Sequence, residues 1–322
     1  MHEIPERNMG FGLVRVTEEA AVAAGRWMGL GNRKEADQSA VNAMLAALET
    51  IDMDGVIVIG EEGRHGGQSP FDSGNHVGNK NGPEMDVVID PIDGTQLLIE
   101  GRPGAISVVG VAPRGSLWSP SPAIYMEKIV VDREVASALV PECLDAPAAW
   151  TLALIARVKQ KEIRDLIVFI LDRPRHADLI AEIRMAGARV ALNDEGDIAG
   201  AILAATPGNN VDVLMGIGGV AEGVTAACAV KALGGAMLVR IAPQSKQEHE
   251  KIMQAGLDLN RVLTCDDLVQ SDEIFFAATG ITDGPLLDGV LYHSGRAWTH
   301  SLVIRAETGI RREIRAERLV EG

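Results

Sequence analysis

The stretch DVVIDPIDGTQ, residues 86–96, joins a short apolar run to two carboxylates, a glycine and a hydroxyl. Asp90 and Asp93 repel each other at this spacing unless a cation lies between them or the turn faces water. The segment Gly94-Thr95-Gln96 could begin a helix, whose free backbone N–H groups bind phosphate. A phosphate beside two carboxylates needs divalent cations, and Mg²⁺ and Mn²⁺ prefer such hard oxygen ligands. The turn therefore indicates metal-assisted phosphate chemistry, although an acid-rich turn by itself is usually only a solvated turn.

Further carboxylates occur where they could join this turn. Glu61 and Glu62 follow the β-rich run VIVIG, and binding sites often gather at strand ends. Asp37 lies near the start of an expected helix, where an acid also favours the helix dipole. Two metal ions about 3.5–4 Å apart activate water and neutralise a leaving phosphate. Such a pair needs four or five carboxylates, and Asp37, Glu61, Asp90 and Asp93 supply four.

Two helices and a set of short strands are expected to position these residues. Residues 17–30 and 33–49 are rich in alanine with apolar residues at helical spacing, and Thr17 followed by acids resembles an N-cap. A polar loop is expected between residues 62 and 83. Short β-rich runs bounded by Gly, Pro and Asp predict strands at 56–60, 86–90, 105–112 and 126–131.

The second half of the chain alternates strand-like and helical segments. The strand-like runs cover 165–172, 188–192 and 211–218, and the helical segments cover 175–187, 196–205 and 221–234. This alternation predicts parallel βαβ units with helices on both faces of a sheet. We therefore expect an α/β protein that is α+β in its N-terminal half and α/β in its C-terminal half, with domains at 1–160 and 161–322.

The composition narrows the class of protein. The 322 residues suffice for two domains, and 47% apolar with 23% charged residues is typical of a folded globular chain. The net charge of -15 disfavours nucleic acid and anionic membranes as partners. The three cysteines form no C-x-x-C pair and no apolar run is long enough to span a bilayer, so we expect a cytoplasmic protein. The C-terminal run RREIRAER predicts a solvent-facing edge.

The ordered set of motifs resembles a known family. Asp37 on a helix, IGEE at 59–62 and DPIDGT at 90–95 resemble the metal-dependent, lithium-sensitive phosphatase superfamily, which includes inositol monophosphatases and fructose-1,6-bisphosphatases. The stretches GPEMDVVIDPIDGT, GAISVVGVA, YMEKIVV, LDRPRH, GIGGVAEG and ATGITDG resemble the class II fructose-1,6-bisphosphatases, and the matches run from about residue 10 to 310.

This resemblance implies a fold and a reaction. The fold would be the layered αβαβα sugar-phosphatase fold, with metal binding in the N-terminal domain and sugar-phosphate binding shared by the C-terminal domain. The enzyme would use Mn²⁺ or Mg²⁺ and form a homo-oligomer, either a dimer or a tetramer. It would hydrolyse the 1-phosphate of fructose 1,6-bisphosphate, giving fructose 6-phosphate and phosphate in gluconeogenesis.

The family's residue roles carry over to matching positions. The implied metal ligands are Asp37 and Glu61 for one ion, and Asp90, Asp93 and Glu222 for the other. The implied catalytic residues are Thr95, Asp93 and Glu61, and Thr95 would orient the attacking water. The implied substrate-binding residues are Asp93, Gly94, Thr95, Tyr125, Arg173, Pro174, Arg175, Glu195, Gly196, Asp197 and Gly219.

Several positions depart from the family pattern. The family commonly has G-E-G-E where this chain has Gly60-Glu61-Glu62-Gly63, so the second acid has moved by one position and the role of Glu62 is open. The loop at 64–82 lacks the usual acidic and apolar pattern, and Glu195 stands where a D-G-D loop has its first Asp. Because such loops read the length of the sugar, sedoheptulose 1,7-bisphosphate is an alternative substrate.

Two other functions compete with a phosphatase. Gly216-x-Gly218-x-x-Ala221 matches the dinucleotide fingerprint, and Arg240 would suit the 2′-phosphate of an NADP-dependent oxidoreductase. That hypothesis gives Glu222 no role, whereas a phosphatase uses it as a metal ligand. A non-catalytic sugar-phosphate-binding regulator would need a broken catalytic set, yet every assigned position holds a competent residue.

Overall fold

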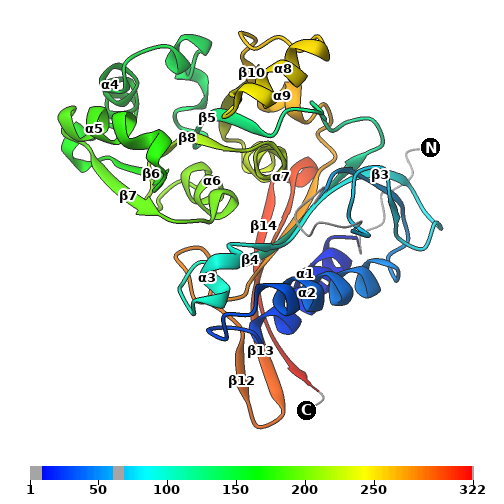
Figure 1. Ribbon diagram of the computed structural model, residues 1–322. Coiled ribbons are helices and arrows are strands. Elements are labelled where there is room, and N and C mark those ends of the chain that lie inside the picture. Colours follow the sequence, from blue (N-terminus) through cyan, green and yellow to red (C-terminus); the bar gives the residue numbers. More distant parts are fainter. Residues whose placement is uncertain (1–8, 61–68, 321–322) are drawn as a thin grey trace. The chain divides into compact units, whose positions relative to one another are not determined.

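Two separate β-sheets organise the chain in the computed structural model, which describes residues 9–60 and 69–320 (Figure 1). The first unit contains residues 1–117 and 271–322, and the second contains residues 118–270. We expected the domains to meet at residue 160, whereas the chain enters the second unit at Trp118 and returns to the first at Ser271. The difference arises because the C-terminal strands complete the first sheet.

The first unit contains an eight-stranded mixed sheet. Its strands are β1 (Asp54–Ile59), β2 (His76–Val77), β3 (Glu84–Asp93), β4 (Ile106–Pro113), β11 (Phe275–Gly280), β12 (Leu291–His293), β13 (Arg296–Arg305) and β14 (Ile310–Leu319). β1 and β3 are parallel, whereas β3, β4, β11 and β13 follow one another in antiparallel pairs. The strands expected at 56–60, 86–90 and 105–112 are thus present.

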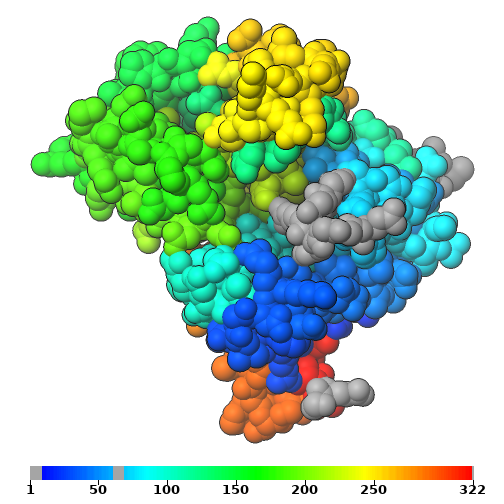
Figure 2. Space-filling view, viewed as in Figure 1, coloured from blue at the N-terminus to red at the C-terminus, as the bar shows by residue number. Residues whose placement is uncertain are grey.

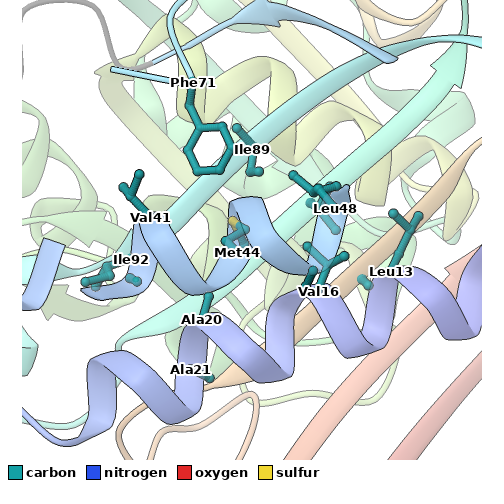
Figure 3. Close-up of a cluster of buried hydrophobic side chains, with 14 of the residues drawn as sticks. Leu13, Val16, Ala20, Ala21, Val41, Met44, Leu48, Phe71, Ile89 and Ile92 are labelled. Atoms are coloured by element: carbon teal, nitrogen blue, oxygen red, sulfur yellow. The ribbon is translucent and has the colours of Figure 1, made fainter. Parts of the chain in front are cut away.

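Helices α1 (Met9–Gly25) and α2 (Arg33–Leu48) pack on this sheet through apolar side chains. Leu13 of α1, Met44 of α2 and Ile89 of β3 lie in one buried cluster (Figure 3). β3 is buried from its second residue to its last. The strand that carries the predicted metal ligands is therefore embedded in the unit rather than exposed at its surface.

The second helix begins where the sequence predicts, but the first does not. We expected a helix over 17–30 capped by Thr17, whereas α1 begins at Met9 and ends at Gly25. Thr17 lies inside α1, where its hydroxyl hydrogen-bonds with that of Thr279 at 2.7 Å. The cap assignment was wrong because the residues before Thr17 also present buried side chains and extend the helix.

The second unit is a six-stranded sheet with helices. Its strands are β5 (Tyr125–Val131), β6 (Ile167–Leu171), β7 (Arg189–Asn193), β8 (Val213–Gly219), β9 (Ala236–Ile241) and β10 (Leu263–Thr264). Its helices are α4 (Ala148–Lys159), α5 (Ala177–Met185), α6 (Asp197–Ala205), α7 (Val220–Ala232), α8 (Lys246–Gln254) and α9 (Cys265–Leu268). β6 is parallel to both β7 and β8, as the alternation predicts, while β5 and β9 add antiparallel strands.

Helices cover both faces of this second sheet. Val168 and Ile170 of β6 belong to a buried cluster shared with α4 and α5. Phe169 points the other way, because a Cβ added at Gly200 of α6 would lie 2.4 Å from its ring. Side chains alternate between the two faces of a strand, so α4 and α5 lie on one face and α6 on the other. The predicted α/β class is confirmed.

Among the described residues, no helix is both long enough and apolar enough to cross a membrane.

Candidate active site

The acid-rich turn forms at the end of β3 through local backbone geometry. The pairing of β3 with β4 is interrupted between Asp90 and Asp93, and the backbone N–H of Ile92 donates to Asp90 Oδ1 at 3.0 Å. Gly94 follows with φ 95°, and a Cβ there would lie 3.2 Å from the Cα of Ala105. Only glycine adopts this conformation without strain, so Gly94 lets the chain turn sharply into α3.

Helix α3 (Thr95–Ile99) begins at Thr95, as the sequence predicts, and the Thr95 hydroxyl connects two elements. Thr95 Oγ1 donates to Asp37 Oδ1 at 3.4 Å and to the carbonyl of Ile92 at 3.2 Å. Asp37 lies on α2, whose start is fixed by Asn32, because the Asn32 side chain accepts from the N–H of Glu35. The structure therefore brings together Asp37 and Thr95, two residues 58 positions apart.

Three predicted metal ligands of the first unit are buried carboxylates. Asp37 is 9% exposed, and Asp90 and Asp93 are each 5% exposed. Carboxylate oxygens are the donors that hard divalent cations prefer, and burying a carboxylate is costly unless cations and hydrogen bonds compensate its charge. Within residues 9–60 and 69–320, no three His, Cys, Asp or Glu side chains are arranged to hold a metal ion. Glu61 and Glu62 lie outside the described residues, and their predicted roles stay predictions.

The predicted sugar-phosphate residues follow the carboxyl ends of three adjacent parallel strands in the second unit. Arg173, Pro174 and Arg175 follow β6, Glu195, Gly196 and Asp197 follow β7, and Gly219 and Glu222 lie at and after the end of β8. The order of these strands is β8-β6-β7. Ligands of open α/β sheets bind outside this edge, which is where the second-unit residues collect.

Arg175 is held in place by a neighbouring strand and a ring. Its Nη2 and Nε donate to the carbonyl of Ile217 at 2.8 and 3.2 Å, and its guanidinium carbon lies 5.3 Å from the centre of the Tyr125 ring. Burial lowers the pKa of Arg175 below its usual value. Tyr125 stands opposite Gly219 in the β5–β8 ladder. Tyr125, Arg175 and Gly219 thus lie at one end of these strands.

His176 anchors this arrangement, although sequence spacing gave it no role. It is 2% exposed, and its Nδ1 and Nε2 lie 2.7 Å from the carbonyl of Leu171 and 2.8 Å from the N–H of Ile217. The Ile217 peptide therefore links two side chains, because its N–H donates to His176 and its carbonyl accepts from Arg175. Burial lowers the pKa of His176, which favours the neutral ring that both contacts require.

A buried ion pair supports the loop predicted to contact the sugar. Lys128 and Asp197 form a salt bridge, and their side chains are 1% and 8% exposed. Gly196 precedes α6 as its N-cap residue with φ 91°, and a Cβ at Gly218 would lie 2.0 Å from Asp197 Oδ2. Lys128 was not among the predicted site residues, and its only signal in the sequence is a cation inside the apolar run MEKIVV.

Glycines at the end of β8 make room for side chains of this cluster. A Cβ at Gly219 would lie 1.9 Å from Glu222 Oε2, and one at Gly216 would lie 3.0 Å from the His176 ring. Arg240 donates to Asp145 at 2.6 Å and to Glu127 at 2.8 Å. Side-chain packing thus explains the glycine pattern, and carboxylates engage the arginine that an NADP-dependent oxidoreductase would need for the 2′-phosphate.

The helix-start turn with its buried acids lies in the first unit, and the basic residues at the parallel sheet edge lie in the second unit. Residues 7–318 match the family model described as bacterial fructose-1,6-bisphosphatase, glpX-encoded. The chain therefore belongs to this family of phosphoric monoester hydrolases, and the family resemblance is confirmed. The family implies a metal-dependent bisphosphatase acting on a sugar bisphosphate.

Named relatives match along nearly the whole chain. The fructose-1,6-bisphosphatase class 2 of Haemophilus influenzae is 38% identical, covering 94% of this chain and 93% of its own length. The D-fructose 1,6-bisphosphatase class 2/sedoheptulose 1,7-bisphosphatase of Synechococcus sp. strain JA-3-3Ab is 37% identical with the same two coverages. A second protein of that name, from Synechococcus sp. strain JA-2-3B'a(2-13), is also 37% identical.

Proposed function

We propose that this protein is a cytoplasmic enzyme that hydrolyses the 1-phosphate of fructose 1,6-bisphosphate to fructose 6-phosphate and phosphate. The family match and the relatives' names support this substrate. The observation that best supports this reaction is the hydrogen bond from Thr95 to Asp37, because it joins the acid-rich turn to α2 at one hydroxyl group.

The acids of the first unit would hold the metal ions. Asp37 with Glu61 would bind one ion, and Asp90 with Asp93 would bind the other, while Glu222 of the second unit stays a predicted ligand. Bound Mg²⁺ or Mn²⁺ would acidify a water molecule and shield the charge of the phosphate. The burial of Asp37, Asp90 and Asp93 supports this assignment, because carboxylates withdrawn from water favour bound cations.

Thr95 would align the attacking water. Its hydroxyl can donate to Asp37 or to the carbonyl of Ile92, so its oxygen lone pairs are left to accept a hydrogen bond from water. A water held in this way would be positioned for attack on the phosphate, and positioning of this kind supplies a large share of phosphoryl-transfer catalysis. Asp37 would thus act twice, as a metal ligand and as the acceptor that orients Thr95.

The second-unit residues would bind the sugar and its distal phosphate. Arg173 and Arg175 match phosphate oxygens because a guanidinium donates two parallel hydrogen bonds. The contact of Arg175 with Ile217 and Tyr125 fixes the direction of its fork before the substrate binds. Glu195, Gly196 and Asp197 would contact the sugar hydroxyls, with Asp197 held by Lys128.

The alternative substrate is sedoheptulose 1,7-bisphosphate. Two relatives carry both activities in their names, so the same reaction on a longer sugar is the second candidate. The two substrates share the phosphate that reacts and differ in the distance to the distal one. The ratio of their kcat/KM values therefore measures how Arg173, Arg175 and Glu195 read sugar length.

The test is phosphate release by metal-stripped protein, with Mg²⁺ or Mn²⁺ added back. Fructose 1,6-bisphosphate, sedoheptulose 1,7-bisphosphate and inositol 1-phosphate form the substrate panel. We expect metal-dependent release from a sugar bisphosphate and little from inositol 1-phosphate, which lacks a distal phosphate. Equal turnover of all three substrates would contradict the role of the arginines, and turnover without metal would contradict the role of the acids.

A further inference from the structure

β14 is the outer strand of the first unit's sheet. It pairs with β13 along ten consecutive residue pairs, from Ile310 opposite Arg305 to Leu319 opposite Arg296, without a bulge. β11 and β12 pair with other parts of β13, and both must lie on its opposite side because β14 follows the whole strand. Within the described residues no strand pairs with the far edge of β14, so its outward N–H and carbonyl groups are open to another strand.

The side chains of β14 divide into two faces. Ile314 packs against the buried cluster formed by α1, α2 and the sheet, and from Glu313 onward exposed and half-buried residues alternate. The solvent face carries Arg311, Glu313, Arg315 and Glu317, which alternate in sign. Figure 2 shows the orange turn between the neighbouring strands β12 and β13 at the molecular surface.

Charges of a single sign on an edge strand would block pairing with any second copy, whereas alternating charges select a register. Two copies of β14 can pair antiparallel around a two-fold axis perpendicular to the sheet. Because this axis leaves each face of the sheet on the same side in both copies, directly opposed residues are both odd-numbered or both even-numbered. The axis then lies midway between one residue and the same residue of the second copy, and we name the axis by that residue. An axis at Glu313 opposes Glu313 to itself and Arg311 to Arg315. An axis at Arg315 opposes Arg315 to itself and Glu313 to Glu317.

An axis at Ile314 removes every like-charge opposition on the solvent face. It places Arg311 opposite Glu317 of the second copy and Glu313 opposite Arg315 of the second copy, each twice by symmetry. Ile314 meets its own copy at the axis, and nine residues from 310 to 318 pair, forming a ladder about 30 Å long. The register with its axis at Ile314 thus provides four opposite-charge pairs, whereas the registers with the axis at Glu313 or at Arg315 place like charges opposite each other.

We propose that the free edge of β14 binds a second copy of this chain, in an antiparallel ladder with its two-fold axis at Ile314. The existing ion pairs support this arrangement, because they hold the charged side chains along the sheet. Arg311 contacts Glu313 at 2.7 Å, and Glu317 contacts Arg296 of β13 at 2.8 Å. Pairing adds an opposite charge on the open side of each residue and continues the sheet across both copies. The interface does not depend on the reaction proposed above.

Charge variants test the register through the mass of the assembly, measured by light scattering after size exclusion. Glu313→Arg creates two Arg–Arg oppositions, and we expect it to halve the mass of the assembly while circular dichroism stays unchanged. The double variant Glu313→Arg/Arg315→Glu exchanges the two charges and restores the opposite-charge pairs, so we expect the wild-type mass to return. A monomeric wild type, or a Glu313→Arg variant of wild-type mass, would overturn the interface.

Cysteine substitution tests the position of the axis. Only a residue on a two-fold axis lies opposite its own copy, so Ile314→Cys should form a covalent dimer under mild oxidation. Ala316→Cys is the matched control, because residue 316 would face residue 312 of the second copy and its thiols would be too far apart. Cys143, Cys228 and Cys265 are buried and should contribute no cross-link. Equal cross-linking of both variants, or none at 314, would overturn the proposed register.

Discussion

Replacing Lys128 by methionine tests whether the Lys128–Asp197 ion pair holds the predicted sugar-binding loop of the second unit in place. The Lys128 and Asp197 side chains are 1% and 8% exposed and form an ion pair. Removing one partner of such a pair leaves an unpaired buried charge, which destabilises a protein by about 3–5 kcal/mol. Methionine keeps the volume of lysine, so the loss comes from the charge rather than from a cavity. We expect Lys128→Met to lower the free energy of unfolding by about this amount.

The double variant separates the charge from the packing. Lys128→Met/Asp197→Asn removes both charges, and the free energy of unfolding should recover at least about half of the single variant's loss. Urea unfolding at pH 7 measures both variants, and steady-state kinetics measures their function. Because Asp197 belongs to the loop predicted to contact the sugar, KM should rise more than kcat falls in Lys128→Met. A loss below about 1 kcal/mol, or strictly additive losses in the double variant, would refute the argument.

Three further substitutions probe the acid-rich turn of the first unit and the residues at the strand ends of the second unit. Thr95→Ala should lower kcat by about 10²–10³-fold with little change in KM, whereas Thr95→Ser keeps the hydroxyl and should stay within about tenfold of wild type; equal losses would contradict the water-orienting role. Gly219→Ala places a Cβ against the Glu222 carboxylate, so half-maximal activation should need about 10–100-fold more metal, and an unchanged metal titration would refute this. Burial lowers the pKa of His176 from 6.5, so below pH 6.5 the unfolded state binds more protons than the folded state, and the free energy of unfolding decreases as the pH is lowered. His176→Asn should make the free energy of unfolding less dependent on pH in this range. An unchanged pH dependence would contradict this prediction.

The sequence predicted the local parts of the first-unit site. The DPIDGT stretch combines a proline, a glycine and two acids after an apolar run, so both the strand end and the helix beginning at Thr95 were readable. The start of α2 was equally clear from its alanine spacing. These features depend on neighbouring residues, and local sequence determines them.

Long-range pairing limited the prediction of the domains. β11 is placed in the first sheet by pairing with β4, which is more than 150 residues away in the chain, and β13 and β14 are added through β11. Hydrophobic periodicity identifies a strand but not its partner, so the expected boundary at 160 followed the local change of pattern instead.

Side chains with unusual environments were also missed. Lys128 occupies an otherwise apolar strand, and only the folded structure shows that Asp197 compensates its burial. His176 had no spaced partner in the sequence, because both of its contacts are with backbone groups, of Leu171 on β6 and of Ile217 on β8. Such residues are recognised by what they touch, which composition and spacing do not encode.

Metal-dependent hydrolysis through the acids of the first unit is tested most directly by measuring phosphate release from fructose 1,6-bisphosphate. Wild type and Asp90→Asn are each titrated with Mn²⁺ and Mg²⁺ after removal of metal. The substitution keeps the size of the side chain and removes its charge. We expect metal-dependent turnover by wild type, and a loss of activity in Asp90→Asn that only higher metal concentrations relieve. Metal-independent turnover by wild type, or an unchanged metal titration in Asp90→Asn, would contradict it.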